Sequence, residues 1–148
     1  GNVLVLYQLV EKHGDILYRM MSEAYKDRIV RYIHGGVKTD VREQIREEAE
    51  NNDNVVIVAS YGTYSTGVNI RNLNNVVFAS PSKSRIRNLQ SIGRALRRTD
   101  KKMNASLFDV ADDLTHKSYQ NYTLKHLIER IKIYNSEKFD YKMKKFLL

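Results

Sequence analysis

The sequence predicts an α/β fold, in which a parallel β-sheet is flanked by helices and followed by a helical C-terminal extension. Short apolar runs alternate with segments whose apolar residues recur at helical spacing, which is typical of βαβ units. The run at 55–60, Val-Val-Ile-Val-Ala-Ser, is apolar at consecutive positions, as strands buried on both faces of a parallel sheet are. With 148 residues, the chain is long enough for one domain with a substantial core.

The predicted elements follow one another in a regular order. Short apolar runs predict five strands, at residues 3–7, 29–33, 55–60, 76–79 and 105–110. Apolar residues on one face predict helices over 13–25 and 39–50, and Thr39 is the expected N-cap of the second. A loop is expected at 61–69. A basic helix is expected over about 84–98, and one or two helices within 116–148. The predicted organisation is a core domain of residues 1–114 and a helical extension of residues 115–148 that packs on it.

Composition excludes several classes of protein. The chain has no cysteine, which excludes a disulfide scaffold, a cysteine-ligated zinc site and thiol chemistry. No apolar run approaches the ~18 residues of a membrane span, and the first residues do not resemble a signal peptide, so we expect a cytoplasmic protein without a membrane partner. An apolar strand begins almost directly after Gly1, which suggests a segment of a longer protein.

Positive charge is concentrated in two segments. The chain has 25 Lys and Arg against 17 Asp and Glu, a net charge of +8. Residues 1–82 are net −1, whereas residues 83–102 are net +7 and residues 115–148 are net +5. This pattern favours a polyanionic partner, either nucleic acid or nucleotide phosphate, and a solvated surface that keeps the protein soluble is the alternative.

Two segments carry residues suited to phosphate binding. The loop after residues 55–60 contains two glycines and several hydroxyl residues, which could present backbone N–H groups to a phosphate or simply form turns. In the basic helix, Arg94 and Arg97 are three residues apart and Gln90 is four before Arg94, so all three share one face. Two guanidiniums on one face suit bidentate phosphate binding, with a solvated basic face as the alternative.

The adjacent acids Asp112 and Asp113 follow a predicted strand and could bind Mg²⁺, but the sequence has no phosphate-binding loop to accompany them. We interpret them instead as an acidic cluster at the N-terminus of a helix, where the helix dipole favours negative charge. No metal site is therefore predicted in this chain.

The pattern Gln90-x-x-Gly93-Arg94-x-x-Arg97 resembles motif VI of superfamily-2 helicases. The surroundings fit in order and spacing over residues 2–114: residues 3–7 are similar to motif IV, 33–36 to the segment after it, 55–60 with 66–70 to motif V, and 109–112 to the acidic end of the strand after motif VI. The chain thus resembles the second, C-terminal RecA-like motor domain of these helicases, and looks very like that of a recombination and repair helicase of bacteriophages.

The resemblance implies a nucleotide-facing set of residues. Arg94 and Arg97 match the arginine fingers, and Gln90 matches the glutamine near the nucleotide or its attacking water. Gly67 matches the motif V glycine beside the phosphates, and Asn69 stands where the family usually has aspartate, so it can hydrogen-bond but carries no charge. ATP and Mg²⁺ would be held mainly by the first motor domain, because this sequence lacks a Walker-A loop and an acidic box.

A second set of residues is expected to contact nucleic acid. Gln8 and the run His34-Gly35-Gly36 lie where family members touch the DNA backbone, and for His34 a locally bonded turn histidine is the alternative. Ser60 and Thr63 both fall near the DNA-facing hydroxyl of motif V. The choice between them stays open, because the loop is one residue longer than usual. The basic residues that precede the finger helix are the first candidates for backbone contacts: Lys83, Arg85 and Arg87.

The tail interleaves basic and aromatic residues, which suggests either nucleic-acid contact or packing. For the segment 122–134 we expect the aromatics to pack on the domain, and for 139–148 both readings stay open.

The sequence therefore predicts one half of an ATP-driven DNA helicase or translocase that acts on single-stranded and branched DNA in recombination, replication restart and repair. The chain alone should be inactive and should work with an N-terminal RecA-like domain of the same protein, in the cytoplasm of an infected bacterial host. The alternative is a RecA-like clamp or adaptor that binds nucleic acid without hydrolysis. A stand-alone metabolic α/β enzyme is disfavoured, since no catalytic dyad of that kind is present.

Overall fold

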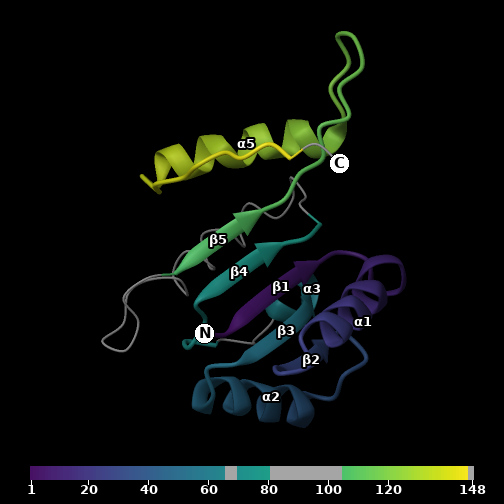
Figure 1. The fold of residues 1–148 in the computed structure, drawn as a ribbon, viewed down its shortest axis with the longest axis vertical. Coiled ribbons are helices and arrows are strands. Elements are labelled where there is room, and N and C mark those ends of the chain that lie inside the picture. Colours follow the sequence, from purple (N-terminus) through teal and green to yellow (C-terminus); the bar gives the residue numbers. More distant parts are fainter. Residues whose placement is uncertain (66–69, 81–104, 147–148) are drawn as a thin grey trace.

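The fold is a five-stranded parallel sheet with helices on both faces (Figure 1). The computed structural model describes residues 1–65, 70–80 and 105–146. The strands are ordered β2-β3-β1-β4-β5, and every neighbouring pair is parallel. Their bounds are β1 Val3–Tyr7, β2 Ile29–Ile33, β3 Val55–Ser60, β4 Asn75–Phe78 and β5 Ser106–Asp109. The predicted α/β class and all five predicted strands are confirmed.

The helices in the first half of the chain lie close to their predicted positions. A π-helical turn, η1 (Val10–Gly14), leads into α1 (Asp15–Ala24), and α2 spans Thr39–Asn51. Lys38 is the N-cap of α2, so the prediction that Thr39 caps this helix is wrong: Thr39 is its first helical residue. The predicted loop after β3 begins with a short helix, α3 (Tyr61–Ser65). The predicted basic helix lies outside the described residues.

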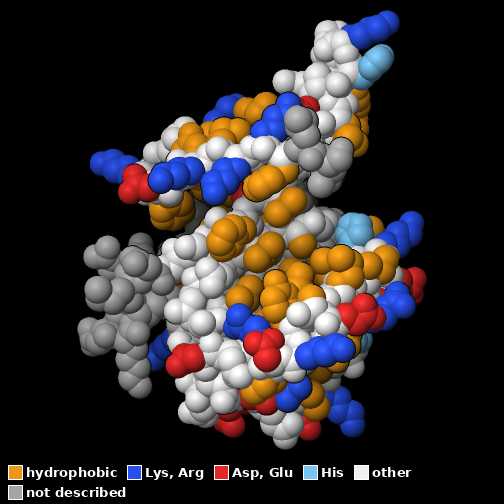
Figure 2. Space-filling view, viewed as in Figure 1, with side chains coloured by type: hydrophobic (Ala, Val, Ile, Leu, Met, Phe, Trp, Pro, Cys, Tyr) orange, Lys and Arg blue, Asp and Glu red, His pale blue; other side chains and the backbone are white. Residues whose placement is uncertain are grey.

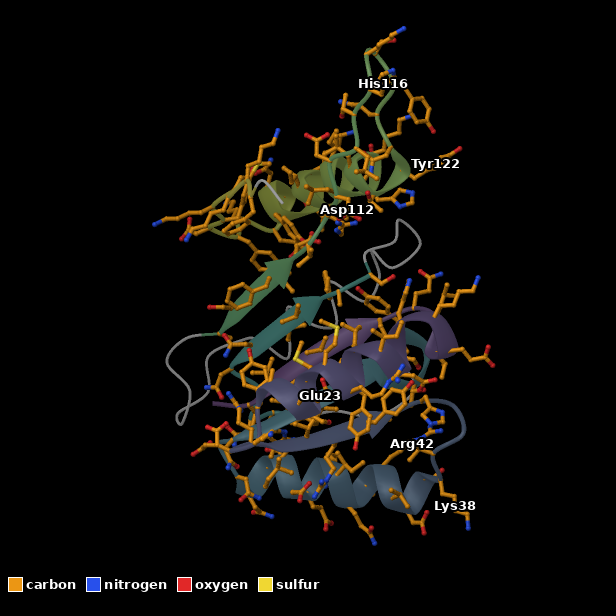
Figure 3. The ribbon with its side chains drawn as sticks, turned by 45° about the vertical axis from the view of Figure 1, so that its right-hand side comes forward. Glu23, Lys38, Arg42, Asp112, His116 and Tyr122 are labelled. Carbon is orange, nitrogen blue, oxygen red and sulfur yellow. The ribbon has the colours of Figure 1, made fainter. Side chains whose placement is uncertain are left out.

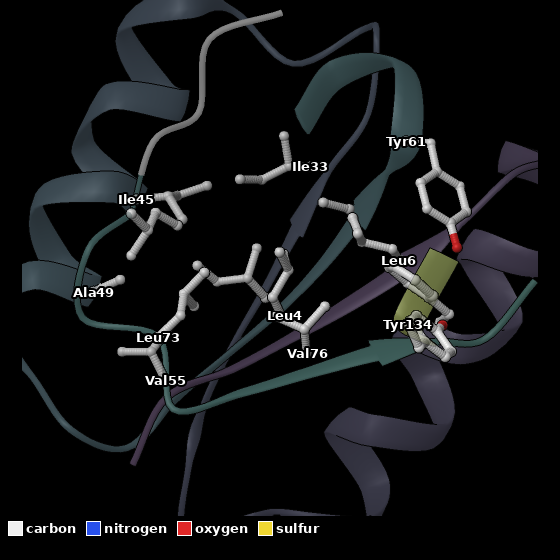
Figure 4. Packing of buried hydrophobic residues seen from close by; sticks show 14 residues of the cluster. Leu4, Leu6, Ile33, Ile45, Ala49, Val55, Tyr61, Leu73, Val76 and Tyr134 are labelled. Carbon is white, nitrogen blue, oxygen red and sulfur yellow. The ribbon is translucent and has the colours of Figure 1, made fainter. Parts of the chain in front are cut away.

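Alternate residues of the central strand face two separate apolar clusters. Leu4 and Leu6 of β1 pack with Ile45 and Ala49 of α2 on one face (Figure 4). On the other face, Val5 and Tyr7 pack with α1 through the side chains Leu17, Tyr18 and Met21. The strands need apolar side chains on both faces, because helices cover both faces of the sheet.

Over residues 115–146 the structure has one helix, α5 (Tyr122–Ser136), and it starts later than predicted. Before it, residues 112–121 form a hairpin closed by mutual backbone hydrogen bonds between His116 and Tyr119, of 3.0 and 2.9 Å. After it, residues 139–146 are not helical. The interpretation of Asp112 and Asp113 as a helix N-terminus is wrong, because α5 begins at Tyr122, beyond this hairpin.

A buried ion pair fastens α5 to the edge strand. Arg130 is only 2% exposed and donates from Nε and Nη2 to the two carboxylate oxygens of Asp109, at 2.7 and 2.9 Å. The Tyr134 hydroxyl donates to the same carboxylate at 2.6 Å, and its ring joins the α2-side cluster. Burial, together with the negative charge of Asp109, raises the pKa of Tyr134. Asp109, at the end of β5, therefore holds the extension on the sheet.

The substitution Asp109→Ala should lower the free energy of unfolding by about 3–5 kcal/mol, because it leaves the buried Arg130 guanidinium without its carboxylate. Urea unfolding measures this change. In the matched control Glu43→Gln, the lost partner is Arg46 in an exposed pair, which should contribute no more than ~1 kcal/mol. Equal losses for the two variants would contradict the anchoring role.

Candidate nucleic-acid and nucleotide site

The carboxyl ends of β2, β3 and β1 bring three of the predicted site residues to one edge of the sheet. Tyr7 pairs with Ser60, and Ile33 pairs with Ala59, so these strands end in register. Gln8 and His34 each follow directly, and Ser60 is the last residue of its strand. Ligands of open α/β sheets bind at this edge. The parallel topology therefore gathers Gln8, His34 and Ser60 into one neighbourhood.

His34 opens a tight turn after β2. Its Nδ1 accepts a hydrogen bond from the Gly36 N–H at 3.2 Å, and its carbonyl accepts from the Val37 N–H at 3.0 Å. This local bonding is what the turn-histidine alternative predicts. The other ring nitrogen, Nε2, has no hydrogen-bond partner within the described part of the chain. Gly35 is exposed, and apart from its own chain neighbours no atom lies within 4 Å of the place where a Cβ would stand. A ligand can therefore approach this backbone closely.

Arg42 of α2 fixes the same turn from outside. Its Nε donates to the Val37 carbonyl at 2.7 Å, and its Nη2 donates to the carbonyl of Gly35 at 3.0 Å. Arg42 and Lys38 both lie at the start of α2, below the turn (Figure 3). Two cations at a helix N-terminus oppose the helix dipole, which favours negative charge there. This arrangement leaves the region suited to an anion.

Stacked aromatic rings support the turn from beneath. The rings of Tyr18 and Tyr32 stack with centroids 5.1 Å apart, and the His34 ring lies 4.9 Å from Tyr32. The Tyr32 hydroxyl donates to Asp15 at 2.8 Å. A Cβ at Gly14 would stand 2.4 Å from the Tyr32 oxygen, so only glycine fits here. Burial first, then hydrogen bonds with Tyr7 and Asp15, raise the pKa of Tyr32.

Ser60 and Thr63 are buried at the start of α3. Their hydroxyls lie 2.8 Å apart and share a hydrogen bond, and the Thr63 N–H donates to Ser60 Oγ at 3.3 Å. Ser60 is 8% exposed and Thr63 is 6% exposed, whereas Gln8 is exposed. In this conformation Gln8 and Gly35 are exposed to solvent. The two buried hydroxyls bond to each other and stabilise the loop.

The nucleotide-facing residues of the prediction lie outside the described residues. So do the basic residues that precede the finger helix, and all of these stay predictions: Gly67, Asn69, Lys83, Arg85, Arg87, Gln90, Arg94 and Arg97. Over residues 1–65, 70–80 and 105–146, no group of three or more His, Asp or Glu side chains could hold a metal ion. In the same ranges, no helix is both long and apolar enough to cross a bilayer.

The sequence prediction missed Arg42 and Tyr32 as parts of this site. For Tyr32 the signal was available, because residues two apart on a strand share a face, and Tyr32 precedes His34 by two. Arg42 gave no such signal, since its role depends on how α2 packs beside the turn.

The chain belongs to the helicase conserved C-terminal domain family, whose model matches residues 1–99. The likeness to superfamily-2 helicases and the RecA-like fold are thereby confirmed. The chain is 40% identical to the ATP-dependent DNA helicase UvsW of Enterobacteria phage T4, over 97% of this chain. It spans about 30% of the length of that relative.

Solved structures agree with this assignment. The crystal structure of T4 UvsW matches with a TM-score of 0.75 at 39% identity, over 97% of this chain and 30% of that one. The C-terminal part of the Fun30 ATPase domain matches with a TM-score of 0.61 at 16% identity, over 91% of this chain and 48% of that one, which shows the fold alone.

The free energy of unfolding should fall in alkaline solution because buried and partly buried tyrosines resist ionisation. The pKa values of Tyr7, Tyr32, Tyr64 and Tyr134 are all raised, and burial raises that of Tyr64 to about 12. In the unfolded chain these tyrosines ionise at a pH of about 10. The free energy of unfolding should thus be unaffected below this pH and should decrease as the pH rises toward about 12.

Urea unfolding at several pH values, followed by tyrosinate absorbance, measures this decrease. The variant Tyr64→Phe should show a shallower decrease than the unmodified chain. A free energy of unfolding that stays constant between pH ~10 and ~12 would contradict the raised pKa values.

Proposed function

We propose that this chain is the second motor domain of an ATP-dependent superfamily-2 DNA helicase or translocase that acts on branched DNA in recombination, replication restart and repair. The single observation that carries the proposal is the family match over residues 1–99, which includes Gln90-x-x-Gly93-Arg94-x-x-Arg97. T4 UvsW, an ATP-dependent DNA helicase, is similar over 97% of this chain. The protein would act in the cytoplasm of an infected bacterial host.

In this proposal Arg94 and Arg97 donate to the γ-phosphate of ATP held by an N-terminal RecA-like domain of the same protein. Guanidiniums there stabilise the negative charge that develops as the phosphoryl group transfers. Gln90 orients the attacking water, the backbone at Gly67 approaches the phosphates, and Asn69 hydrogen-bonds nearby without contributing charge.

Mg²⁺ would be bound mainly by the other motor domain. The donor set of this chain fits that division, because its sequence has no phosphate-loop lysine and no acidic box. When bound, the ion would neutralise phosphate charge, and the residues of this chain would contribute cationic, neutral side-chain and backbone hydrogen-bonding groups.

The DNA backbone would lie along the carboxyl edge of the sheet. Exposed Gln8 and the open backbone at Gly35 would contact phosphates, with His34 Nε2 as a further donor. Lys83, Arg85 and Arg87 would supply further contacts to the DNA backbone. Ser60 and Thr63 would act by shaping the loop, or after a rearrangement that exposes one hydroxyl.

A clamp or adaptor that binds DNA without hydrolysis remains the second candidate. It is favoured only by the lack of a phosphate-binding loop in this sequence. A Walker-A lysine and an acidic box elsewhere in the same protein would decide for the motor.

In the full-length protein, Arg94→Ala or Arg97→Ala should lower ATP turnover by roughly 10³–10⁵-fold, the effect of an arginine finger. Steady-state ATPase with DNA measures turnover, and a melting curve on the same sample checks the fold. Arg46→Ala is the matched control, because Arg46 pairs with Glu43 on an exposed helix face and should leave turnover unchanged. Turnover near the unmodified rate in both finger variants would contradict the proposed roles.

The 148-residue chain alone should not hydrolyse ATP at a measurable rate and should bind ATP weakly, because the phosphate-binding loop is supplied by another domain. Titration with labelled ATP and an ATPase assay with single-stranded DNA test this expectation. Tight ATP binding together with DNA-stimulated turnover by the purified chain would refute the division between two motor domains.

A further inference from the structure

The hairpin of residues 112–121 projects beyond the N-terminal end of α5, away from the sheet (Figures 1 and 3). Its base is held firmly by Asn121. The Asn121 side chain donates to the Asp112 carbonyl at 2.9 Å and accepts from the Leu114 N–H at 3.1 Å. The hairpin therefore presents its side chains from a fixed support, as a binding surface requires.

Two exposed tyrosines meet a lysine at this corner. Tyr119 is 57% exposed and Tyr122 is 70% exposed. The Lys125 ammonium lies 5.1 Å from the ring centre of Tyr119 and 5.8 Å from that of Tyr122. The prediction that aromatics of segment 122–134 pack on the domain is thus confirmed for Tyr134 and wrong for Tyr122. We call Tyr119, Tyr122, Lys125 and the hairpin-tip residue Lys117 the tyrosine corner.

The charge of the corner is available to a ligand. The sequence has no acidic residue from 114 to 128, and within the described part of the chain neither Lys117 nor Lys125 forms an ion pair. The nearest acid of the hairpin, Asp113, is already bonded by Thr115 and lies 3.6 Å from Lys145. The space-filling view shows basic and histidine side chains at the projecting tip of the hairpin (Figure 2).

We propose that the tyrosine corner binds single-stranded nucleic acid, with bases stacked on Tyr119 and Tyr122 and phosphates contacted by Lys117 and Lys125. Exposed aromatic rings beside unpaired cations are the features that bind single strands without sequence preference. The corner lies beyond residues 1–99, so it is separate from the motifs that define the family. The proposal rests on the DNA-dependent function proposed above and adds a second contact for the strand.

A protein partner fits the corner less well. Lys117 has a φ of 54°, in the left-handed region that favours glycine. The turn therefore carries a cation at a position where the backbone alone would favour glycine. Cations are depleted in the cores of protein interfaces, whereas they dominate the contacts to nucleic-acid backbones.

Fluorescence anisotropy of labelled oligo-dT, titrated with the whole chain at several salt concentrations, tests the proposal. Tyr119→Ala and Tyr122→Ala should each weaken binding by about 5-fold to 100-fold, while Tyr122→Phe keeps the ring and should bind like the unmodified chain. Lys125→Ala, and Lys117→Gly, which keeps the positive φ, should each reduce the salt slope by about 0.7. The controls are Tyr25→Ala, at the exposed C-cap residue of α1, and Lys132→Ala, at a lysine paired with Glu129.

A spectroscopic signature distinguishes stacking from indirect effects. The chain contains no tryptophan, so Tyr122→Trp introduces a single reporter, and its emission should be quenched by saturating oligo-dT. An unchanged emission would overturn stacking. So would a loss of oligo-dT affinity in Tyr122→Phe as large as the loss in Tyr122→Ala. Normal binding by both alanine variants would overturn the corner alone and leave the motor function standing. Absence of any oligonucleotide binding would overturn the corner and the proposed DNA partner, while the ATPase test of the arginine fingers remains independent.

Discussion

The parallel pairing of β1 with a strand on each side is the constraint on which the rest of the structure depends. Residues Leu4–Tyr7 are at most 1% exposed, because β3 and β4 flank them and helices cover the sheet. A strand buried in this way has no place for polar chemistry along its length. Polar residues can appear only where the strand ends, at Gln8, and the parallel order brings the ends of β2 and β3 to the same edge.

The sequence was sufficient for the elements whose pattern is local. Consecutive apolar residues predicted the strands, and helical spacing predicted α1 and α2, because these patterns reflect burial directly. The tail was predicted less well. Its hairpin depends on Asn121 bonding to Asp112 and Leu114, and the anchoring of α5 depends on Arg130 reaching Asp109, 21 residues earlier. Contacts between distant residues leave no periodic signal, so helix was expected where a hairpin forms.

The candidate site divides in the same way. The order of the strands places Gln8, His34 and Ser60 at one edge, which the sequence predicted once a parallel sheet was inferred. The burial of Ser60 and Thr63 was not predictable, because a hydroxyl in a loop can face solvent or cap a helix equally well, and here the two bond to each other. Likewise, the sequence pattern marks Arg42 only as a residue of a helix. Its role depends on the hydrogen bonds that its guanidinium donates to the carbonyls of the His34 turn.

The same reasoning changes the meaning of the net charge. Residues 115–148 carry +5 by count, but three of their cations already have carboxylate partners: Arg130 with Asp109, Lys132 with Glu129 and Lys145 with Asp113. These pairs fix the fold or the surface and contribute little to the attraction of a polyanion. Lys117 and Lys125, in contrast, have no acidic partner among the described residues, and Lys125 lies beside two exposed rings. Total charge therefore indicates the kind of partner, whereas the pairing of each cation decides where that partner can bind.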